Sequence, residues 1–162
     1  MLYFAFGSNM LTERLKRRIP STRKVGTGVL NDYELRFHKR GADGSAKCSI
    51  LEKNGNEVHG IIYDIDPAEK PDLDHIEGPG YRQKTVTLQS GSGTFSAYTY
   101  QALKSYRDNS LLPYFWYKSL VLEGAMEHRL PDWYIKNIRK VEAMPDPDSN
   151  RSHKELSIIS KH

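Results

Sequence analysis

Glu77 is the residue of this chain best placed to move a proton. It ends a predicted helix just before Gly78, and Asp74 lies one turn earlier on the same side. The negative end of the helix dipole, the neighbouring carboxylate and burial in an apolar pocket would each raise the pKa of Glu77 toward neutrality. A carboxylate with such a pKa can act as a general acid and base. The alternative is a helix-end glutamate that simply points at water.

A polar bend at Gly7, Ser8, Asn9 and Met10 is the second candidate site. If a helix begins here, its free N–H groups favour an anion or a carbonyl oxygen, so the bend could seat a small molecule that bears a carboxylate. An ordinary strand-to-helix turn is the alternative. The bend lacks the GxGxxG and GxxxxGK[ST] patterns of phosphate-binding loops, and Ser8 is not in a GxSxG nucleophile elbow.

The elements on either side must position this bend. Residues 2–6 are aromatic and apolar and predict a strand covered on both faces. Residues 10–18 predict a short helix, with Asn9 as its N-cap and with Leu11 and Leu15 on one face. We therefore expect the bend to lie at the amino end of a helix.

Alternating apolar residues and turn signals predict two pairs of strands in the next part of the chain. Asn31-Asp32 is expected to form the first turn, and Asn54-Gly55 is a strong hairpin signal because both residues tolerate positive φ. The four predicted strands cover residues 25–30, 33–38, 46–52 and 58–65.

The helix that carries Glu77 is predicted to begin with Asp66 as its N-cap and Pro67 at its first position, and Pro71 could kink it. Gly78 is expected to end this helix as a left-handed cap. Beyond it, the sequence predicts a hairpin formed by residues 81–89 and 94–102. Two helices are expected at residues 113–128 and 131–143, followed by a poorly ordered polar tail at residues 146–162.

The composition is typical of a soluble globular domain. Of 162 residues, 38% are hydrophobic and 27% are charged, which favours one domain, expected at residues 1–145. The net charge of +4 and the early cluster of basic residues come without any nucleic-acid-binding signature, so we interpret the cluster as a solvated basic face and expect no nucleic acid partner. These basic residues are Arg14, Lys16, Arg17, Arg18, Arg23 and Lys24.

Cysteine and histidine usage bears on redox and metal chemistry. The single cysteine, Cys48, excludes an intramolecular disulfide, fits a reducing compartment and is expected to be a small buried hydrophobe in a strand. The six histidines show no HExxH pattern, so no metal site is expected. No apolar run approaches the length of a membrane span. We expect a cytoplasmic protein without a membrane partner.

Three segments resemble the gamma-glutamylcyclotransferase family. Residues 3–10, YFAFGSNM, resemble the YGSN-type signature at the start of that family, and residues 73–78, LDHIEG, followed by Tyr81, look like its LDxxEG…Y segment. Residues 114–120 with Gly124, Leu130-Pro131 and the closing helix are similar to its carboxyl-terminal part. The similarity covers roughly residues 2 to 145 in one order.

This resemblance implies an α+β fold, a mixed β-barrel flanked by helices, with a γ-glutamyl pocket and no cofactor. Carried over by position, Glu77 would be the catalytic acid and base. The implied substrate-binding residues are Phe6, Gly7, Ser8, Asn9, Met10, Tyr81, Arg82, Tyr100 and Tyr117, with Arg82 the weaker candidate. Phe6 stands where the family usually has tyrosine, so a hydroxyl is missing there, which bears on substrate preference.

The implied reaction is cyclisation of a γ-glutamyl amide to 5-oxoproline with release of the attached amine. Removal of a γ-glutamyl protecting group in secondary-metabolite synthesis, by the same cyclisation, is one alternative. A non-catalytic module that binds a small metabolite or nucleic acid is another. The sequence leaves the leaving amine and the oligomeric state open, and a homodimer is compatible with it.

Overall fold

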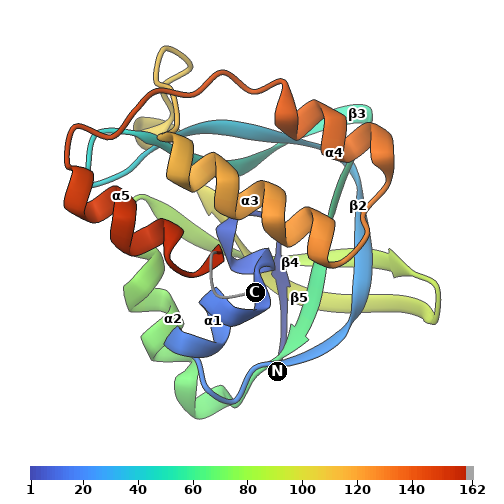
Figure 1. Ribbon diagram of the computed structural model, residues 1–162. Helices are drawn as coiled ribbons and strands as arrows, with labels where there is room; N and C mark the ends of the chain where they lie inside the picture. The colour runs from blue at the N-terminus through green and yellow to red at the C-terminus, as the bar shows by residue number, and fades with distance from the viewer. Residues whose placement is uncertain (160–162) are drawn as a thin grey trace.

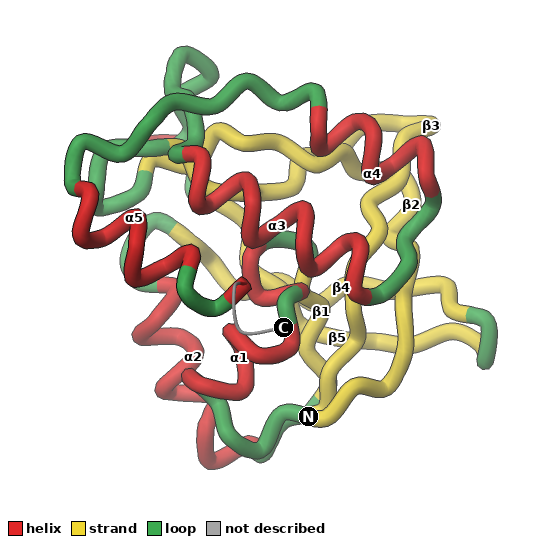
Figure 2. Tube along the Cα trace, viewed as in Figure 1, coloured by secondary structure: helices red, strands yellow, loops and turns green. Residues whose placement is uncertain are grey.

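The computed structural model describes residues 1–159 as a closed five-stranded β-barrel flanked by helices (Figures 1 and 2). Around the barrel the strand order is β1-β3-β2-β4-β5. β1 pairs antiparallel with β3 but parallel with β5, so the sheet is mixed, which confirms the predicted fold class. The strands are β1 (Leu2–Ala5), β2 (Arg23–Arg40), β3 (Ala46–Asp64), β4 (Tyr81–Ser90) and β5 (Gly93–Ala102).

The two longest strands, β2 and β3, form a single hairpin whose tip lies between Arg40 and Ala46. The predicted turns at residues 31–32 and 54–55 are therefore wrong. Asp32, with φ of 63°, lies at a register shift in β2, and its carboxylate accepts a hydrogen bond at 3.0 Å from the N–H of Gly55 across the pair. Residues that tolerate positive φ are found in β-bulges as well as in hairpin turns. Asp32 and Gly55 do adopt positive φ, but they lie at an irregularity within the hairpin and not in a turn.

The helices follow the predicted order with different ends. A 3-10 turn, η1 (Ser8–Met10), precedes α1 (Thr12–Arg18), and a second, η2 (Pro67–Glu69), precedes α2 (Lys70–Glu77). The predicted single helix is thus divided into η2 and α2 at Lys70, one residue before Pro71, where a kink was considered. A third 3-10 turn, η3, follows β5, and two helices come after it. These are η3 (Lys104–Tyr106), α3 (Phe115–Glu127) and α4 (Asp132–Arg139).

The two predicted capping residues act on different segments, Asp66 at the start of η2 and Gly78 at the end of α2, whereas Glu69 at the N-cap position of α2 makes no side-chain cap. The carboxylate of Asp66 accepts a hydrogen bond at 2.9 Å from the N–H of Ala68. Gly78 adopts φ of 72°, and its N–H donates to the carbonyl of Asp74 at 3.1 Å. Because this conformation disfavours a side chain, Gly78 fixes Glu77 as the last helical residue.

In the core, η1 packs against both β1 and α3. Phe4 of β1 and Met10 of η1 are fully buried, and Cys48 is buried in β3 as predicted. A Cβ at Gly124 of α3 would lie only 2.7 Å from the Leu11 nitrogen and from the Met10 Cβ. The missing side chain therefore lets α3 pack directly on the backbone that leads out of η1.

The tail predicted to be poorly ordered instead contains a helix, α5 (Ser149–Leu156), which packs beside α3. Asp146 receives two hydrogen bonds of 2.6 Å from Arg151 and one of 2.8 Å from the Trp116 indole. Ile158 is buried against the core. Composition suggested disorder because the few apolar anchors of the tail are spaced apart among polar residues. The part of the tail at residues 160–162 lies outside the described residues.

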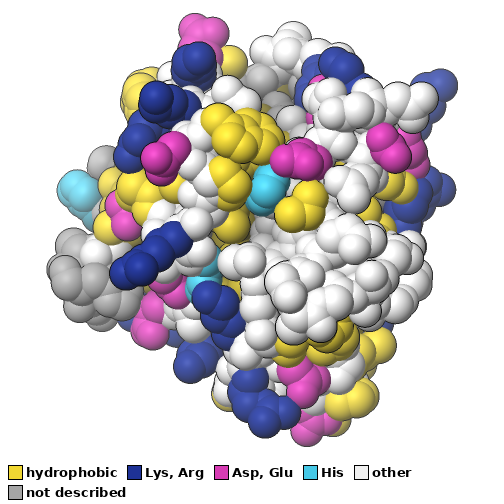
Figure 3. Space-filling view, turned by 90° about the vertical axis from the view of Figure 1, so that its right-hand side faces the viewer, with side chains coloured by type: hydrophobic (Ala, Val, Ile, Leu, Met, Phe, Trp, Pro, Cys, Tyr) yellow, Lys and Arg dark blue, Asp and Glu magenta, His cyan; other side chains and the backbone are white. Residues whose placement is uncertain are grey.

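No helix within residues 1–159 is long and apolar enough to cross a membrane. On the face shown in Figure 3, lysine and arginine side chains are interspersed with aspartate and glutamate. This face therefore does not carry a continuous basic surface of the kind that binds nucleic acid.

Candidate active site

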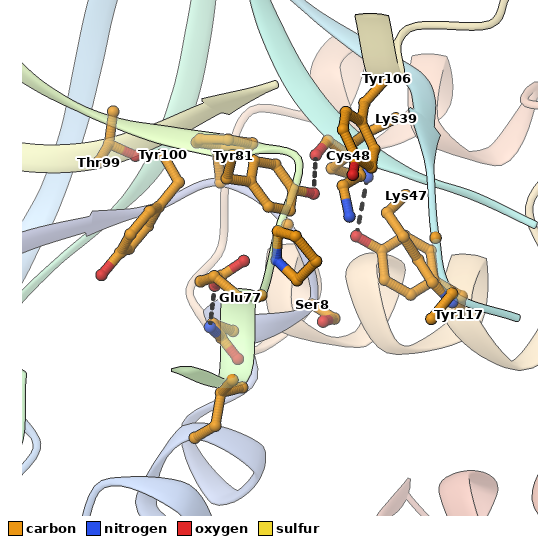
Figure 4. Close-up of a pocket in the computed structure, with 18 of the residues that line it drawn as sticks. Ser8, Lys39, Lys47, Cys48, Glu77, Tyr81, Thr99, Tyr100, Tyr106 and Tyr117 are labelled. Atoms are coloured by element: carbon orange, nitrogen blue, oxygen red, sulfur yellow. Dashed lines mark hydrogen bonds between the residues drawn. The ribbon is translucent and has the colours of Figure 1, made fainter. Parts of the chain in front are cut away.

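Segments distant in the sequence converge on a cavity of about 580 Å³. Its walls come from the segment after β1, the end of α2, the tip of the β2–β3 hairpin, the strands β4 and β5, and α3. Of the predicted site residues, the cavity is lined by Phe6, Gly7, Ser8, Asn9, Glu77, Tyr81, Tyr100 and Tyr117. Figure 4 shows Glu77 and Ser8 near each other, with the tyrosines arranged around them.

Glu77 faces this cavity and is held by the bend after β1. The Asn9 Nδ2 atom donates a hydrogen bond to Glu77 Oε1 at 3.1 Å (Figure 4). Burial raises the pKa of Glu77 to about 7, and the positive charges of Arg18, Lys39 and Arg14 oppose that rise. The carboxyl group is therefore present in both protonation states near neutral pH, as a general acid and base requires.

Asp74 contributes the smallest of these effects on the pKa of Glu77. Its carboxylate is engaged elsewhere, in an ion pair with Lys70 at 2.7 Å and as acceptor of the Tyr100 hydroxyl. Burial is the largest of the causes that raise the pKa of Glu77, and the charge of Asp74 adds only a small effect in the same direction.

Asn9 does not cap a helix, contrary to the prediction. α1 begins at Thr12, and Leu11 occupies its N-cap position without a side-chain cap. The Asn9 amide instead donates to the Tyr3 hydroxyl at 3.2 Å and accepts from Arg18 Nη1 at 3.3 Å. Since arginine only donates, this contact directs the amide oxygen of Asn9 toward Arg18 and its NH₂ group toward Glu77.

Two tyrosines form a fixed wall of the cavity. The Tyr81 hydroxyl donates to the Cys48 carbonyl at 2.7 Å, and the Tyr117 hydroxyl accepts from the Cys48 N–H at 2.9 Å (Figure 4). Burial raises the pKa of both tyrosines well above the usual value, so both hydroxyls stay neutral. The two tyrosines therefore present polar hydroxyl groups and apolar aromatic rings to the cavity.

Two predicted site residues lie outside the cavity. Met10 is fully buried, and its carbonyl accepts hydrogen bonds from the Tyr63 hydroxyl at 2.7 Å and from His128 Nε2 at 2.9 Å. Arg82 follows Tyr81 on β4 and donates to Gln101 Oε1 at 2.9 Å. Because successive side chains of a strand point to opposite faces, Arg82 cannot share the cavity with Tyr81. Among the described residues, no cluster of histidine, cysteine, aspartate or glutamate could hold a metal ion.

Comparison with known proteins decides the family. The sequence profile of the AIG2-like family matches residues 57–138. The chain is 30% identical over 99% of its length to the gamma-glutamylcyclotransferase of Bos taurus, and 28% identical over 99% to that of Homo sapiens, in each case covering 87% of the relative. The chain belongs to the AIG2-like gamma-glutamylcyclotransferase family. Its members named here are enzymes.

Solved structures agree with this membership in the gamma-glutamylcyclotransferase family. The fold superposes on a gamma-glutamyl cyclotransferase with a TM-score of 0.89 at 27% identity, covering 99% of this chain and 98% of that one. An uncharacterised protein from Homo sapiens gives a TM-score of 0.86, also at 27% identity, with the same coverage. The mixed barrel is therefore shared over its full length.

Several residues that line the cavity of this family member were not predicted, above all Arg14 and Arg18. Both were assigned to a solvated basic face, but Arg14 is 6% exposed and donates to Ser8 Oγ at 3.1 Å and to Glu155 Oε2 at 2.6 Å. Their spacing could have indicated burial, since Arg14 and Arg18 are four residues apart and share one helix face with the buried Leu15. Other lining residues that the sequence did not reveal are Tyr3, Lys39, Arg40, Lys47 and Tyr106.

Proposed function

We propose that this chain is a γ-glutamyl cyclotransferase that converts γ-glutamyl amino acids or γ-glutamylamines to 5-oxoproline and a free amine. The observation that carries the proposal is the contact between Asn9 and Glu77, which joins the glycine-serine-asparagine bend to a carboxyl group with a pKa of about 7. Membership in the gamma-glutamylcyclotransferase family supports it.

The reaction needs no group beyond the substrate itself and one proton carrier. The α-amino nitrogen of the γ-glutamyl unit attacks its own γ-carbonyl carbon and forms the new C–N bond of a five-membered lactam. The bond from that carbon to the leaving nitrogen then breaks. Because nucleophile and electrophile belong to one molecule, the protein mainly holds the cyclising conformer, which can supply several kcal/mol of barrier reduction.

Glu77 would serve both proton transfers. In its ionised form it accepts a proton from the attacking ammonium, and in its protonated form it returns a proton to the departing nitrogen. A pKa of about 7 leaves comparable amounts of both forms at neutral pH. The hydrogen bond from Asn9 occupies Oε1 and leaves Oε2 to face the substrate.

The bend after β1 would hold the γ-glutamyl unit. Arg14 donates a hydrogen bond to Ser8 and Arg18 donates one to Asn9, so two guanidinium groups lie beside the bend along the cavity wall and favour an anion there. The α-carboxylate of the substrate and the developing oxyanion of the γ-carbonyl are the two groups such a bend can stabilise. A cytoplasmic location and a homodimer stay predictions.

The experiment is incubation of the purified protein with a panel of γ-glutamyl amino acids and γ-glutamylamines, followed by measurement of 5-oxoproline. Glu77→Gln keeps the shape of the side chain but cannot cycle a proton, so kcat should fall by about 10²- to 10⁴-fold. Glu142→Gln, at an exposed position, is the matched control and should keep wild-type activity. Undiminished turnover by Glu77→Gln would refute the assigned role.

The same panel separates the alternatives. A preference for one large amine over all γ-glutamyl amino acids would point to removal of a protecting group. Absence of 5-oxoproline from every compound, together with tight and salt-sensitive binding of oligonucleotides, would point to a binding module.

A further inference from the structure

Lys39 is a buried lysine whose ammonium group makes no ion pair with any described residue, although the charge of Glu77 across the cavity acts on it. The residue is 6% exposed and lines the cavity. Within residues 1–159, its Nζ makes no ion pair or hydrogen bond, and it lies over the ring of Tyr81 at 4.6 Å and the ring of Tyr106 at 5.7 Å from the centroids. Lys47, the other lysine of the cavity, is paired with Asp43 at 2.9 Å.

The position of Lys39 is built into the backbone around it. Gly80 adopts φ of 97°, and a Cβ there would lie 2.5 Å from Tyr106 Cδ1 and 2.9 Å from Lys39 Cε. The absent side chain thus makes room for the stem of Lys39 and for the ring of Tyr106. Burial of an ammonium is unfavourable, and cation–π contacts offset only part of the loss of hydration. An anion from a ligand would supply the missing partner.

Lys39 lies across the cavity from the bend after β1. In Figure 4, Lys39 and Tyr106 lie at one side, and Glu77 and Ser8 lie at the other. Lys39 and Glu77 nevertheless line the same cavity, so the ammonium can act on the same ligand. If the bend holds the γ-glutamyl unit and Glu77 faces the scissile amide, the space beside Lys39 receives the leaving amine.

We propose that Lys39 binds a carboxylate on the leaving amine and is the residue by which this chain distinguishes γ-glutamyl amino acids from neutral γ-glutamylamines. This inference rests on the proposed function and assigns a specificity-determining residue to it. A single ammonium matches the single charge of a carboxylate. The neighbouring cations are engaged, since Arg40 donates a hydrogen bond to the Ser105 carbonyl at 3.5 Å and Lys47 is paired with Asp43 at 2.9 Å.

Three substrates that share the γ-glutamyl unit and differ in the leaving amine test the subsite in the wild-type protein. γ-Glutamyl-alanine carries the carboxylate, γ-glutamyl-alaninamide replaces it with a neutral isostere, and γ-glutamyl-ethylamine lacks the group. We expect kcat/KM for the first to exceed that for the other two by about tenfold to a hundredfold, the usual range for one charge-assisted contact. Equal values for the three would overturn the assignment while leaving the proposed function intact. No 5-oxoproline from any of them would refute the proposed function itself.

The variant Lys39→Met identifies the residue responsible. Because loss of this charge also raises the pKa of Glu77, the informative quantity is the ratio of kcat/KM between γ-glutamyl-alanine and γ-glutamyl-ethylamine at one pH. We expect the ratio to fall toward one. Lys53→Met is the matched control, because Lys53 is an exposed lysine paired with Glu34 away from the cavity, and should keep the wild-type ratio.

An equal loss for all three substrates in Lys39→Met would show that Lys39 serves the γ-glutamyl end, which overturns the proposal. Circular dichroism establishes that the variant is folded. If it is not, Lys39→Gln replaces it, since the amide keeps a polar group of similar length in the same place.

Discussion

The amide of Asn9 and the carboxylate of Glu77 meet at 3.1 Å although 68 positions separate them in the chain. Asn9 belongs to the 3-10 turn after β1, and Glu77 is the last residue of α2. The contact fixes one carboxylate oxygen against the turn, so the position of the proton carrier and the position of the bound substrate depend on each other. Loss of either partner should therefore affect more than one step.

Asn9→Leu keeps the approximate volume of the side chain and removes its donor. A hydrogen bond to a charged group contributes about 1.5–3 kcal/mol, so kcat/KM for 5-oxoproline formation should fall by roughly 10- to 100-fold. The pKa of Glu77 should also rise, because the lost bond favoured the ionised form. Asn54→Leu, in an exposed segment of β3, serves as the control. Wild-type kinetics in Asn9→Leu would show that the contact has no part in the reaction.

Arg18→Met should move the acidic limb of the pH profile of kcat/KM to higher pH. The positive charge of Arg18 is the first of the charges that lower the pKa of Glu77, so its removal raises that pKa and delays formation of the base. The substrate amine titrates identically with both proteins, so the difference between the profiles belongs to the protein. Arg17→Met is matched in chemistry, because Arg17 is exposed and paired with Glu13 at 2.8 Å. A limb that stays in place or moves to lower pH would contradict the electrostatic account.

Glu77 should also make the protein less stable as the pH rises from about 4.5 to about 7. Its pKa is raised in the folded state, so across this window the folded protein binds more protons than the unfolded chain, and the free energy of unfolding falls with increasing pH. After allowance for solvent in the open cavity, the effect is roughly 1–3 kcal/mol.

Urea unfolding of the wild type and Glu77→Gln at the two ends of this window measures that contribution. Other titrating groups are common to both proteins and cancel in the comparison. The amide variant should gain stability relative to the wild type at the upper end and not at the lower end. A stability difference that is independent of pH would mean that the carboxyl group is solvated as in the unfolded chain.

The predictable part of this site came from signals that are local in sequence. Gly78 ends a helix wherever the helix lies, so the place of Glu77 as its last residue followed from the chain alone. The pairing of Asn9 with Glu77 could not be predicted in this way, because helix and strand propensities carry no information about a contact between residues 68 positions apart. Only the family resemblance indicated that the two segments converge.

The errors have a common physical origin, since tertiary contacts overrode local preferences. Asp32 and Gly55 have the chemistry of turns but lie opposite each other in one long hairpin. Arginine is usually found at the surface. The guanidinium of Arg14 is nevertheless buried, because it donates hydrogen bonds to the carboxylate of Glu155 from α5 and to the hydroxyl of Ser8. Neither partner can be assigned before the fold is known.

Gly124→Ala should lower both stability and activity, although alanine is the better helix former by about 1 kcal/mol. The added Cβ would meet the backbone at Leu11 and Met10 at 2.7–2.9 Å, so α3 or η1 must move, at a cost of about 1–3 kcal/mol. Because η1 carries Asn9, movement there should weaken the hold on Glu77 and reduce kcat/KM. Gly91→Ala, where an added Cβ meets no atom within 4 Å, is the control. Thermal unfolding and 5-oxoproline release measure both effects, and a Gly124→Ala protein with wild-type values for each would show that the bend does not depend on close packing against α3.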